Sequence, residues 1–151
     1  MNAHDSEKIA GILLNDNYML TEAPDDADLI IFNTCSIRQK AEQKFRSELG
    51  RAKQFKKKKG SIKIAVVGCI AQQQGRALMS RNPQVDYVIG PQNILKLKNI
   101  FDNPAPAVCT DDNSGIEFAN FPAVRKDKKK AWISIMYGCN NFCSYCIVPY
   151  T

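Results

Sequence analysis

Three of the six cysteines in this 151-residue chain lie within eight residues of one another near its carboxyl end. Cys139, Cys143 and Cys146 are separated by three and then two residues in the run CNNFCSYC. Thiolates are the ligands that hold iron–sulfur clusters in proteins. Three thiolates bind three irons of a 4Fe–4S cluster and leave the fourth iron open. The spacing therefore favours a 4Fe–4S site whose open iron binds a substrate or a cofactor.

A zinc site is the alternative for the same run of cysteines. Structural zinc sites need four ligands, which commonly come as two pairs. The run offers three thiols, and the only histidine, His4, lies at the other end of the sequence. Cys109 is a possible fourth ligand, but no motif surrounds it. The iron–sulfur interpretation is favoured, and zinc stays open.

Two further cysteines each follow a short apolar segment. Cys35 follows DLIIFN and Cys69 follows IKIAVV, and both segments read as buried strands. Parallel strands end at one edge of a sheet, where open α/β proteins bind ligands. Cys35 and Cys69 are thus candidate ligands at that edge, although free cysteines are often simply part of a core. Gly68 and Gly138 each precede a cysteine. They either let the backbone approach a cluster or only form a turn.

Strands and helices are expected to alternate through the first hundred residues. Apolar runs predict strands over residues 28–33, 62–67 and 85–89, and helical spacing predicts helices over 6–14, 37–55, 71–80 and 93–101. This alternation predicts an α/β domain in which helices flank an open parallel sheet. Domains of this kind usually open with a strand, whereas this chain opens with a helix. Part of the domain is therefore expected to be missing before Met1.

The chain changes character after residue 103. Residues 104–130 contain three prolines and the run KDKKK, which is typical of a linker, with a short strand expected near 107–109. The segment AWISIMY, residues 131–137, predicts a new strand directly before the cysteine run. One strand and one loop cannot bury a core, so a second domain is expected to be only begun at 131–151. Trp132 and Phe142 are expected to belong to a core.

Charge is distributed unevenly along the chain, whose formal net charge is +6. Residues 1–34 carry seven acidic residues and one lysine, whereas residues 35–61 carry ten lysines and arginines and two acidic residues. Such a basic block suits a polyanion such as RNA, but solvated basic helix faces are common. The chain has no apolar run of the roughly 20 residues that span a membrane, and its first residues lack a secretory pattern. A cytoplasmic location is expected.

Four segments together resemble one known family. DADLIIFNTCSIRQKAEQK, VVGCIAQQQG, VDYVIGPQN and YGCNNFCSYCIVPYT are similar to radical S-adenosylmethionine methylthiotransferases, and to the tRNA-modifying members more than to the ribosomal-protein relatives. The resemblance implies an amino-terminal methylthiotransferase domain over residues 1–103, without its first strand and first cysteine. It further implies a linker over 104–130, and the first strand and cluster loop of a radical (β/α) barrel over 131–151.

The resemblance also implies cofactors and ligands. Cys139, Cys143 and Cys146 correspond to the ligands of a 4Fe–4S cluster whose open iron binds S-adenosylmethionine, the source of a 5′-deoxyadenosyl radical. Tyr145 corresponds to the aromatic residue near the adenine of that cofactor. Cys35 and Cys69 correspond to two of the three ligands of an auxiliary 4Fe–4S cluster. The third ligand is expected two residues upstream of Met1, and Cys109 is not expected to replace it.

The implied activity is tRNA modification, in which carbon 2 of a prenylated adenosine next to the anticodon is methylthiolated. The implied partners are the tRNA anticodon loop and an electron donor such as a flavodoxin, with no membrane and a monomeric enzyme. Other members of the family act on threonylcarbamoyl-adenosine in tRNA or on a ribosomal protein, and these alternatives stay open. Two non-enzymatic alternatives are a truncated fragment without activity and a zinc-binding RNA module. The 151 residues alone are expected to be inactive, since most of the barrel is absent.

Overall fold

The fold is organised around a parallel four-stranded sheet. The computed structural model describes residues 2–103, 105–111, 123–125, 129–133 and 138–150. The strands are β1 (Leu29–Thr34), β2 (Lys63–Gly68), β3 (Tyr87–Ile89) and β4 (Ala107–Cys109). They pair side by side in chain order, and all three pairings are parallel. All the carboxyl ends of the strands therefore lie at one edge of the sheet.

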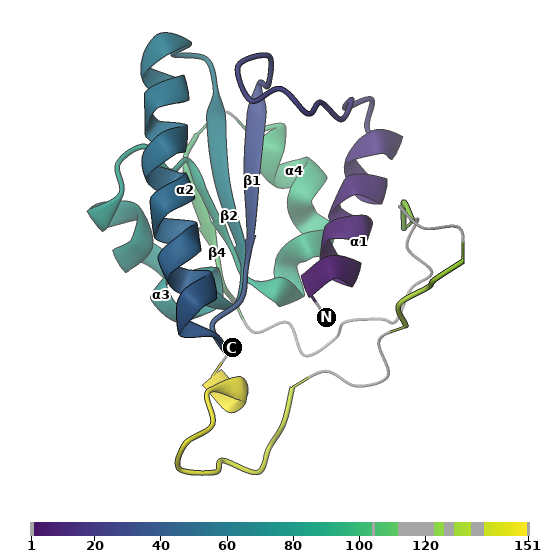
Figure 1. Cartoon of the computed structure of the whole chain (residues 1–151), viewed down its shortest axis with the longest axis vertical. Helices are drawn as coiled ribbons and strands as arrows, with labels where there is room; N and C mark the ends of the chain where they lie inside the picture. Colours follow the sequence, from purple (N-terminus) through teal and green to yellow (C-terminus); the bar gives the residue numbers. More distant parts are fainter. Residues whose placement is uncertain (1, 104, 112–122, 126–128, 134–137, 151) are drawn as a thin grey trace.

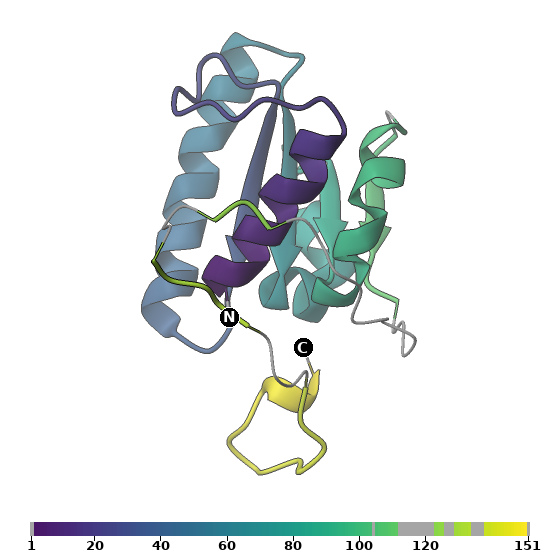
Figure 2. The same ribbon diagram turned by 90° about the vertical axis from the view of Figure 1, so that its right-hand side faces the viewer.

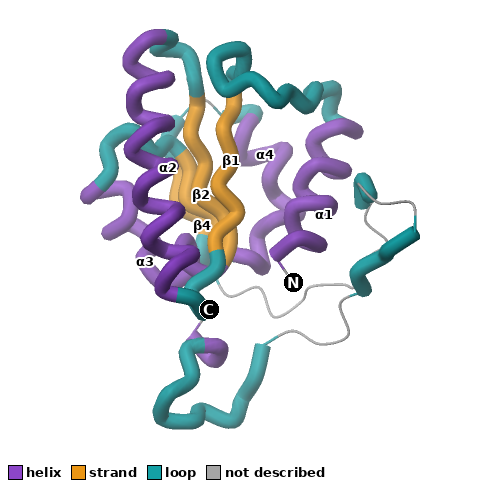
Figure 3. The backbone as a smooth tube through the Cα atoms, viewed as in Figure 1, coloured by secondary structure: helices purple, strands orange, loops and turns teal. Residues whose placement is uncertain are grey.

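Helices cover both faces of this sheet (Figures 1 and 3). On one face lie α2 (Gln39–Lys58) and α3 (Cys69–Arg81). On the other lie α1 (Asn2–Asn15), the 3-10 helix η1 (Pro91–Lys96) and α4 (Leu97–Phe101). Figure 2 looks onto this second face, where α1 and α4 lie side by side and Lys98 pairs with Asp16 at 2.9 Å. The predicted α/β class with an open parallel sheet is confirmed.

The burial pattern explains why these segments form these elements. Phe45, Leu49 and Ala52 of α2 share one stripe and are buried, as their helical spacing predicts. All but the first residue of β2 is buried, because helices pack on both of its faces. Two apolar layers result, one between the sheet and α2 with α3, the other between the sheet and α1 with α4.

Several predicted boundaries differ from those observed. The helix expected over 93–101 is a 3-10 helix followed by a single short α-helix, and Pro91 stands at its start. The helix expected from residue 71 begins at Cys69 and is kinked at Gly75, whose φ is 44°. The strand expected near 107–109 is present as β4, so the sheet extends into the segment predicted as a linker.

The region before the cysteine run is described only in part. Residues 134–137 of the strand expected over 131–137 lie outside the described residues, and 131–133 are not in a strand. Trp132 is 55% exposed and Phe142 is 59% exposed, so the prediction that they belong to a core is wrong in this structure. Both buried clusters found among the described residues belong to the sheet and its helices. None of their residues lies beyond Cys109.

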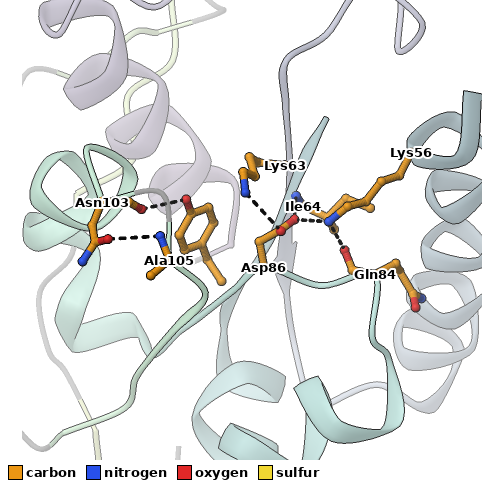
Figure 4. A network of polar contacts seen from close by, with 8 residues as sticks. Lys56, Lys63, Ile64, Gln84, Asp86, Asn103 and Ala105 are labelled. Carbon is orange, nitrogen blue, oxygen red and sulfur yellow. Dashed lines mark hydrogen bonds and ion pairs between the residues drawn. The ribbon is translucent and has the colours of Figure 1, made fainter. Parts of the chain in front are cut away.

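A buried carboxylate ties α2 to the sheet at the amino ends of the strands (Figure 4). Asp86 accepts hydrogen bonds from the backbone N–H of Ile64 at 2.8 Å and from Nζ of Lys56 at 2.5 Å. Lys63 approaches the other carboxylate oxygen at 3.5 Å. Lys56 also donates to the carbonyl of Gln84 at 2.9 Å. Because the carboxylate is paired and hydrogen-bonded, its burial is compensated.

Candidate functional site

Cys35 and Cys69 lie next to each other in the order of the sheet. β1 and β2 pair so that Thr34 is opposite Gly68, and each candidate cysteine is the next residue along its strand's direction. Cys35 begins the connection to α2, and Cys69 is the first residue of α3. Both thiols are half-buried. The prediction that they occupy the carboxyl ends of parallel strands is confirmed, and the strands are neighbours.

The backbone between these two cysteines is closely packed. Gly68 has a φ of 94°, and a Cβ built there would lie 2.5 Å from the carbonyl oxygen of Thr34. An L-residue at this position would combine an unfavourable backbone conformation with a steric clash. The hydroxyl of Thr34 donates to the carbonyl of Val67 at 2.7 Å, in a buried position. Glycine is therefore required at position 68, where β2 ends against Thr34 of β1 and the chain continues to Cys69.

The amino end of α1 reaches the same edge of the sheet. The side-chain amide of Asn33 donates to the hydroxyl of Ser6 at 2.9 Å, which joins the end of β1 to the first turns of α1. Figures 1 and 2 show the amino terminus at the end of the molecule where β1 and β2 finish. Nδ1 of His4 is buried there without a hydrogen-bond partner and lies 4.0 Å from the Glu7 carboxylate. Burial, followed by the charge of Lys8, lowers the pKa of His4 below 6.5.

Two carboxamides close the neighbouring part of this edge, and their positions were not anticipated from the sequence. Gln72, in the first turn of α3, donates to the carbonyl of Thr110 at 2.9 Å and lies against Gly90. Asn93 is fully buried and donates to the carbonyl of Asp111 at 3.0 Å. Together they hold the chain just after β4. The available sequence signal was that each carboxamide follows shortly after the end of a strand, Gln72 in VGCIAQ and Asn93 in IGPQN.

The cysteine loop is held by local contacts. Gly138 and Phe142 have positive φ values of 68° and 47°, which turn the backbone on either side of Cys139. The backbone N–H of Cys146 donates to the carbonyl of Cys143 at 2.9 Å. The ring of Phe142 lies edge-on to Tyr150 at 5.9 Å between centroids, beside the short 3-10 helix η2 (Val148–Tyr150). The loop is therefore turned back on itself.

The thiols of this loop are accessible to solvent. Cys143 is exposed, whereas Cys139 and Cys146 are half-buried. Tyr145, the residue expected near the adenine of a cofactor, is 90% exposed. Accessible thiols and a free aromatic ring are available to a ligand without prior unfolding of a core.

The described residues do not form a closed metal site. Among residues 2–103, 105–111, 123–125, 129–133 and 138–150, no three His, Cys, Asp or Glu side chains are grouped closely enough to hold a metal ion. The donor chemistry nevertheless fits an iron–sulfur cluster, because the loop contributes three thiols and the sheet edge contributes two more. Cys109 lies at the end of β4 and packs partly against the α1 side of the sheet, as a core cysteine does.

A parallel sheet with helices on both faces and thiols at the ends of two adjacent strands defines the class as an open α/β domain, which is followed by a thiol-rich loop. Residues 1–90 match the model of the family described as "Uncharacterized protein family UPF0004". This match covers more than half of the chain, and the chain belongs to this family.

Relatives of known name extend the similarity over the whole chain. It is 51% identical over 152 aligned residues to the tRNA-2-methylthio-N(6)-dimethylallyladenosine synthase of Thermodesulfovibrio yellowstonii, covering 100% of this chain and 35% of the relative. Proteins of the same name from Polynucleobacter asymbioticus and Dictyoglomus thermophilum are 43% and 41% identical, covering 100% and 99% of this chain and 35% of each relative. The chain thus spans about a third of the length of these relatives. The resemblance predicted from the four motifs is confirmed.

None of the helices in the described residues is long and apolar enough to cross a membrane.

Proposed function

We propose that the protein containing this chain methylthiolates carbon 2 of a prenylated adenosine next to the anticodon of tRNA. The observation that carries this proposal is the similarity to synthases of that name across the whole chain, at 51% identity to one of them. The two neighbouring thiols at the carboxyl edge of the sheet support it, because such an edge is where open α/β domains bind ligands. The cytoplasm is the proposed location, and the monomer the proposed state.

Five cysteines are the proposed cluster ligands. Cys139, Cys143 and Cys146 would hold a 4Fe–4S cluster, and S-adenosylmethionine would bind beside it with Tyr145 against the adenine. Cys35 and Cys69 would provide two ligands of a second cluster. When bound, an iron–sulfur cluster of the first kind supplies the electron that cleaves S-adenosylmethionine.

The chain's own residues would position these ligands. Gly68 lets β2 end against Thr34, so that Cys69 leaves the sheet beside Cys35. Gly138 and Phe142 turn the loop that carries the other three thiols. An electron donor such as a flavodoxin would reach the exposed cysteine loop.

We propose the domain division predicted from the sequence. Residues 1–103 form the methylthiotransferase domain, 104–130 connect it, and 131–151 begin the radical domain. The pairing of β4 with β3 supports one amendment, namely that 107–109 pack with the first domain.

The test is a complementation experiment with the full-length protein. Cells that lack the gene receive the wild-type protein or the variants Cys139→Ala, Cys69→Ala and Cys109→Ala, and the methylthiolated nucleoside in bulk tRNA is measured by mass spectrometry. We expect Cys139→Ala and Cys69→Ala to abolish the modified nucleoside, and Cys109→Ala to retain it. Full modification by Cys69→Ala would remove Cys69 from the site.

Metal content separates the cofactor assignment from the activity. Iron and zinc are measured in each purified protein after anaerobic reconstitution. We expect Cys139→Ala and Cys69→Ala each to lose about half of the iron, because each disrupts one of two clusters. Zinc near one equivalent with no iron in the wild-type protein would support a zinc-binding RNA module instead.

A further inference from the structure

Helix α2 carries eight of the 21 lysines and arginines of the chain. Seven of its lysines and arginines are exposed to solvent, namely Lys40, Lys44, Arg46, Arg51, Lys53, Lys57 and Lys58. Its two ends lie at opposite edges of the sheet, because α2 leaves the carboxyl end of β1 and returns to the amino end of β2 (Figure 1). The ends therefore face different parts of the molecule.

Acidic groups offset the charge at the far end of α2. Lys58 lies 3.9 Å from Asp25, and Lys59 lies 2.8 Å from Asp28. Both carboxylates belong to the connection between α1 and β1, which also contains Glu22 and Asp26. Lys56 is bound to Asp86. A polyanion approaching this end would meet carboxylates as well as lysines.

Two lysines at the near end of α2 lack such compensation. Lys40 and Lys44 are exposed and lie one turn apart on the same side of the helix. In the described part of the chain, neither has a carboxylate within ion-pair distance, and the nearby Glu42 is engaged by Arg46 at 2.7 Å. Arg38, also exposed, precedes the first turn. These three residues are called the proximal basic patch.

The proximal basic patch lies beside the candidate cysteines. Cys35 is three residues before Arg38 on the same connection, and Cys69 leaves the neighbouring strand. The far lysines Lys53 and Lys57 are about 20–25 Å further along the helix axis from Lys40, at 1.5 Å per residue. Charge that is both uncompensated and close to the site is therefore found at one end of α2.

From this asymmetry we infer that the proximal basic patch binds the phosphate backbone of the RNA stem next to the base that reacts. The inference rests on the proposed function, since it takes RNA as the substrate. Lysine and arginine bind phosphates with little regard for sequence, and such contacts position a nucleic acid. A base in a single-stranded loop is accessible to an enzyme, while the flanking stem offers its phosphates. The patch would hold the stem so that the loop reaches the carboxyl edge of the sheet.

The test compares two double variants that remove the same charge. Lys40→Gln with Lys44→Gln changes the patch, and Lys53→Gln with Lys57→Gln changes the far end of the same helix. All four lysines are exposed, and none has an ion-pair partner among the described residues. Each full-length variant is titrated with a fluorescent RNA hairpin shaped like an anticodon arm, at several salt concentrations. Circular dichroism and thermal unfolding check that both variants fold like the wild type.

We expect the proximal variant to bind the hairpin roughly tenfold more weakly at low salt. The slope of log affinity against log salt should fall in magnitude by about 1.5–2, since each lost phosphate contact removes about 0.7–1. The distal variant should change the affinity by less than about twofold, because Lys53 and Lys57 lie about 20–25 Å along the helix from Lys40, beyond a Debye length of about 10 Å. Equal effects of the two variants, or a larger effect of the distal one, would overturn the inference.

Failure of the inference and failure of the proposed function have different signatures. The wild-type protein could modify tRNA in cells while the proximal variant binds the hairpin normally. This result would leave the proposed function intact and reject the role of the proximal basic patch. A wild-type protein that neither binds the hairpin nor modifies tRNA rejects both.

Discussion

The two thiol-bearing regions of this chain are built in opposite ways. Cys35 and Cys69 lie 34 positions apart in the sequence and are brought together by the pairing of β1 with β2. Cys139, Cys143 and Cys146 are close in sequence and lie on a loop held by local contacts, among them the turn from Cys143 to Cys146 and the ring contact of Phe142 with Tyr150. In the sheet the protein fold determines where the thiols lie, whereas in the loop sequence spacing keeps them near one another. A packed site is sensitive to distant substitutions, and a local one is not.

The largest expected difference between the regions concerns the glycine before each cysteine. Gly68→Ala should lower the free energy of unfolding by about 3–4 kcal/mol, because its Cβ would meet the Thr34 carbonyl at 2.5 Å and its φ is 94°. Gly138→Ala should lower it by only about 1 kcal/mol, because φ is 68° but no described atom lies within 4 Å of the added Cβ. Urea unfolding of both proteins measures this. Similar losses in the two variants would show that the loop is as tightly packed as the sheet.

A smaller effect is expected from the carboxylate at the amino ends of the strands. Asp86→Ala should destabilise the protein by about 2–4 kcal/mol, because it leaves the buried N–H of Ile64 unsatisfied and Lys56 unpaired. Glu42→Ala, which removes an exposed ion pair with Arg46, should cost less than about 0.5 kcal/mol and serves as the control.

The reactivity of the thiols in the Asp86→Ala variant compares the sheet with the cysteine loop. In Asp86→Ala, Cys35 and Cys69 should react faster with an alkylating reagent, because local opening of the sheet becomes more frequent. Cys143 is already exposed and should react at its wild-type rate. Peptide mass spectrometry resolves the individual cysteines. Uniform acceleration of all three would contradict the independence of loop and sheet.

The smallest expected effect is a pH dependence that arises at the amino end of α1. Burial lowers the pKa of His4 below its ordinary value of 6.5, so the unfolded chain binds a proton more readily than the folded one. Stability should therefore decrease as the pH falls through 6.5 and toward the lower folded-state pKa. His4→Gln, which stays neutral, should weaken this decrease. The free energy of unfolding at pH about 7.5 and about 5.5 is compared in the two proteins.

The neighbouring carboxyl does not obscure this measurement. Burial raises the pKa of Asp5, so this group favours the folded state as it becomes protonated, in a more acidic range and with the opposite sign. Asp5 is present in both proteins, so the contribution of its burial, which is the largest cause of its shift, cancels in their difference. An unchanged pH dependence in His4→Gln would remove His4 as the cause.

Much of the fold was predictable because its signals are local. The apolar runs before Cys35 and Cys69 became β1 and β2, and the stripe of Phe45, Leu49 and Ala52 became the buried face of α2. The exact helix starts were less predictable, since Cys69 is itself the first helical residue. Capping and packing, and not periodicity, determine where a helix begins.

Other parts of the candidate site depend on long-range contacts and could not be predicted. The bonds from Gln72 to Thr110 and from Asn93 to Asp111 join residues 38 and 18 positions apart. The assignment of Trp132 to a core failed because apolar composition alone does not say whether a partner surface exists. Both cases require knowledge of which elements become neighbours in space.

The alternation of elements, the spacing of the five candidate thiols and the resemblance to methylthiotransferases could be predicted from the amino-acid sequence alone, because each depends on residues close together in the chain. Long-range packing makes β1 and β2 neighbours, confines Gly68 against the Thr34 carbonyl, and brings Asp25 and Asp28 to the lysines at the far end of α2. These features depend on strand order and helix direction. Both follow from how the two apolar layers pack against the sheet, which no short segment encodes alone.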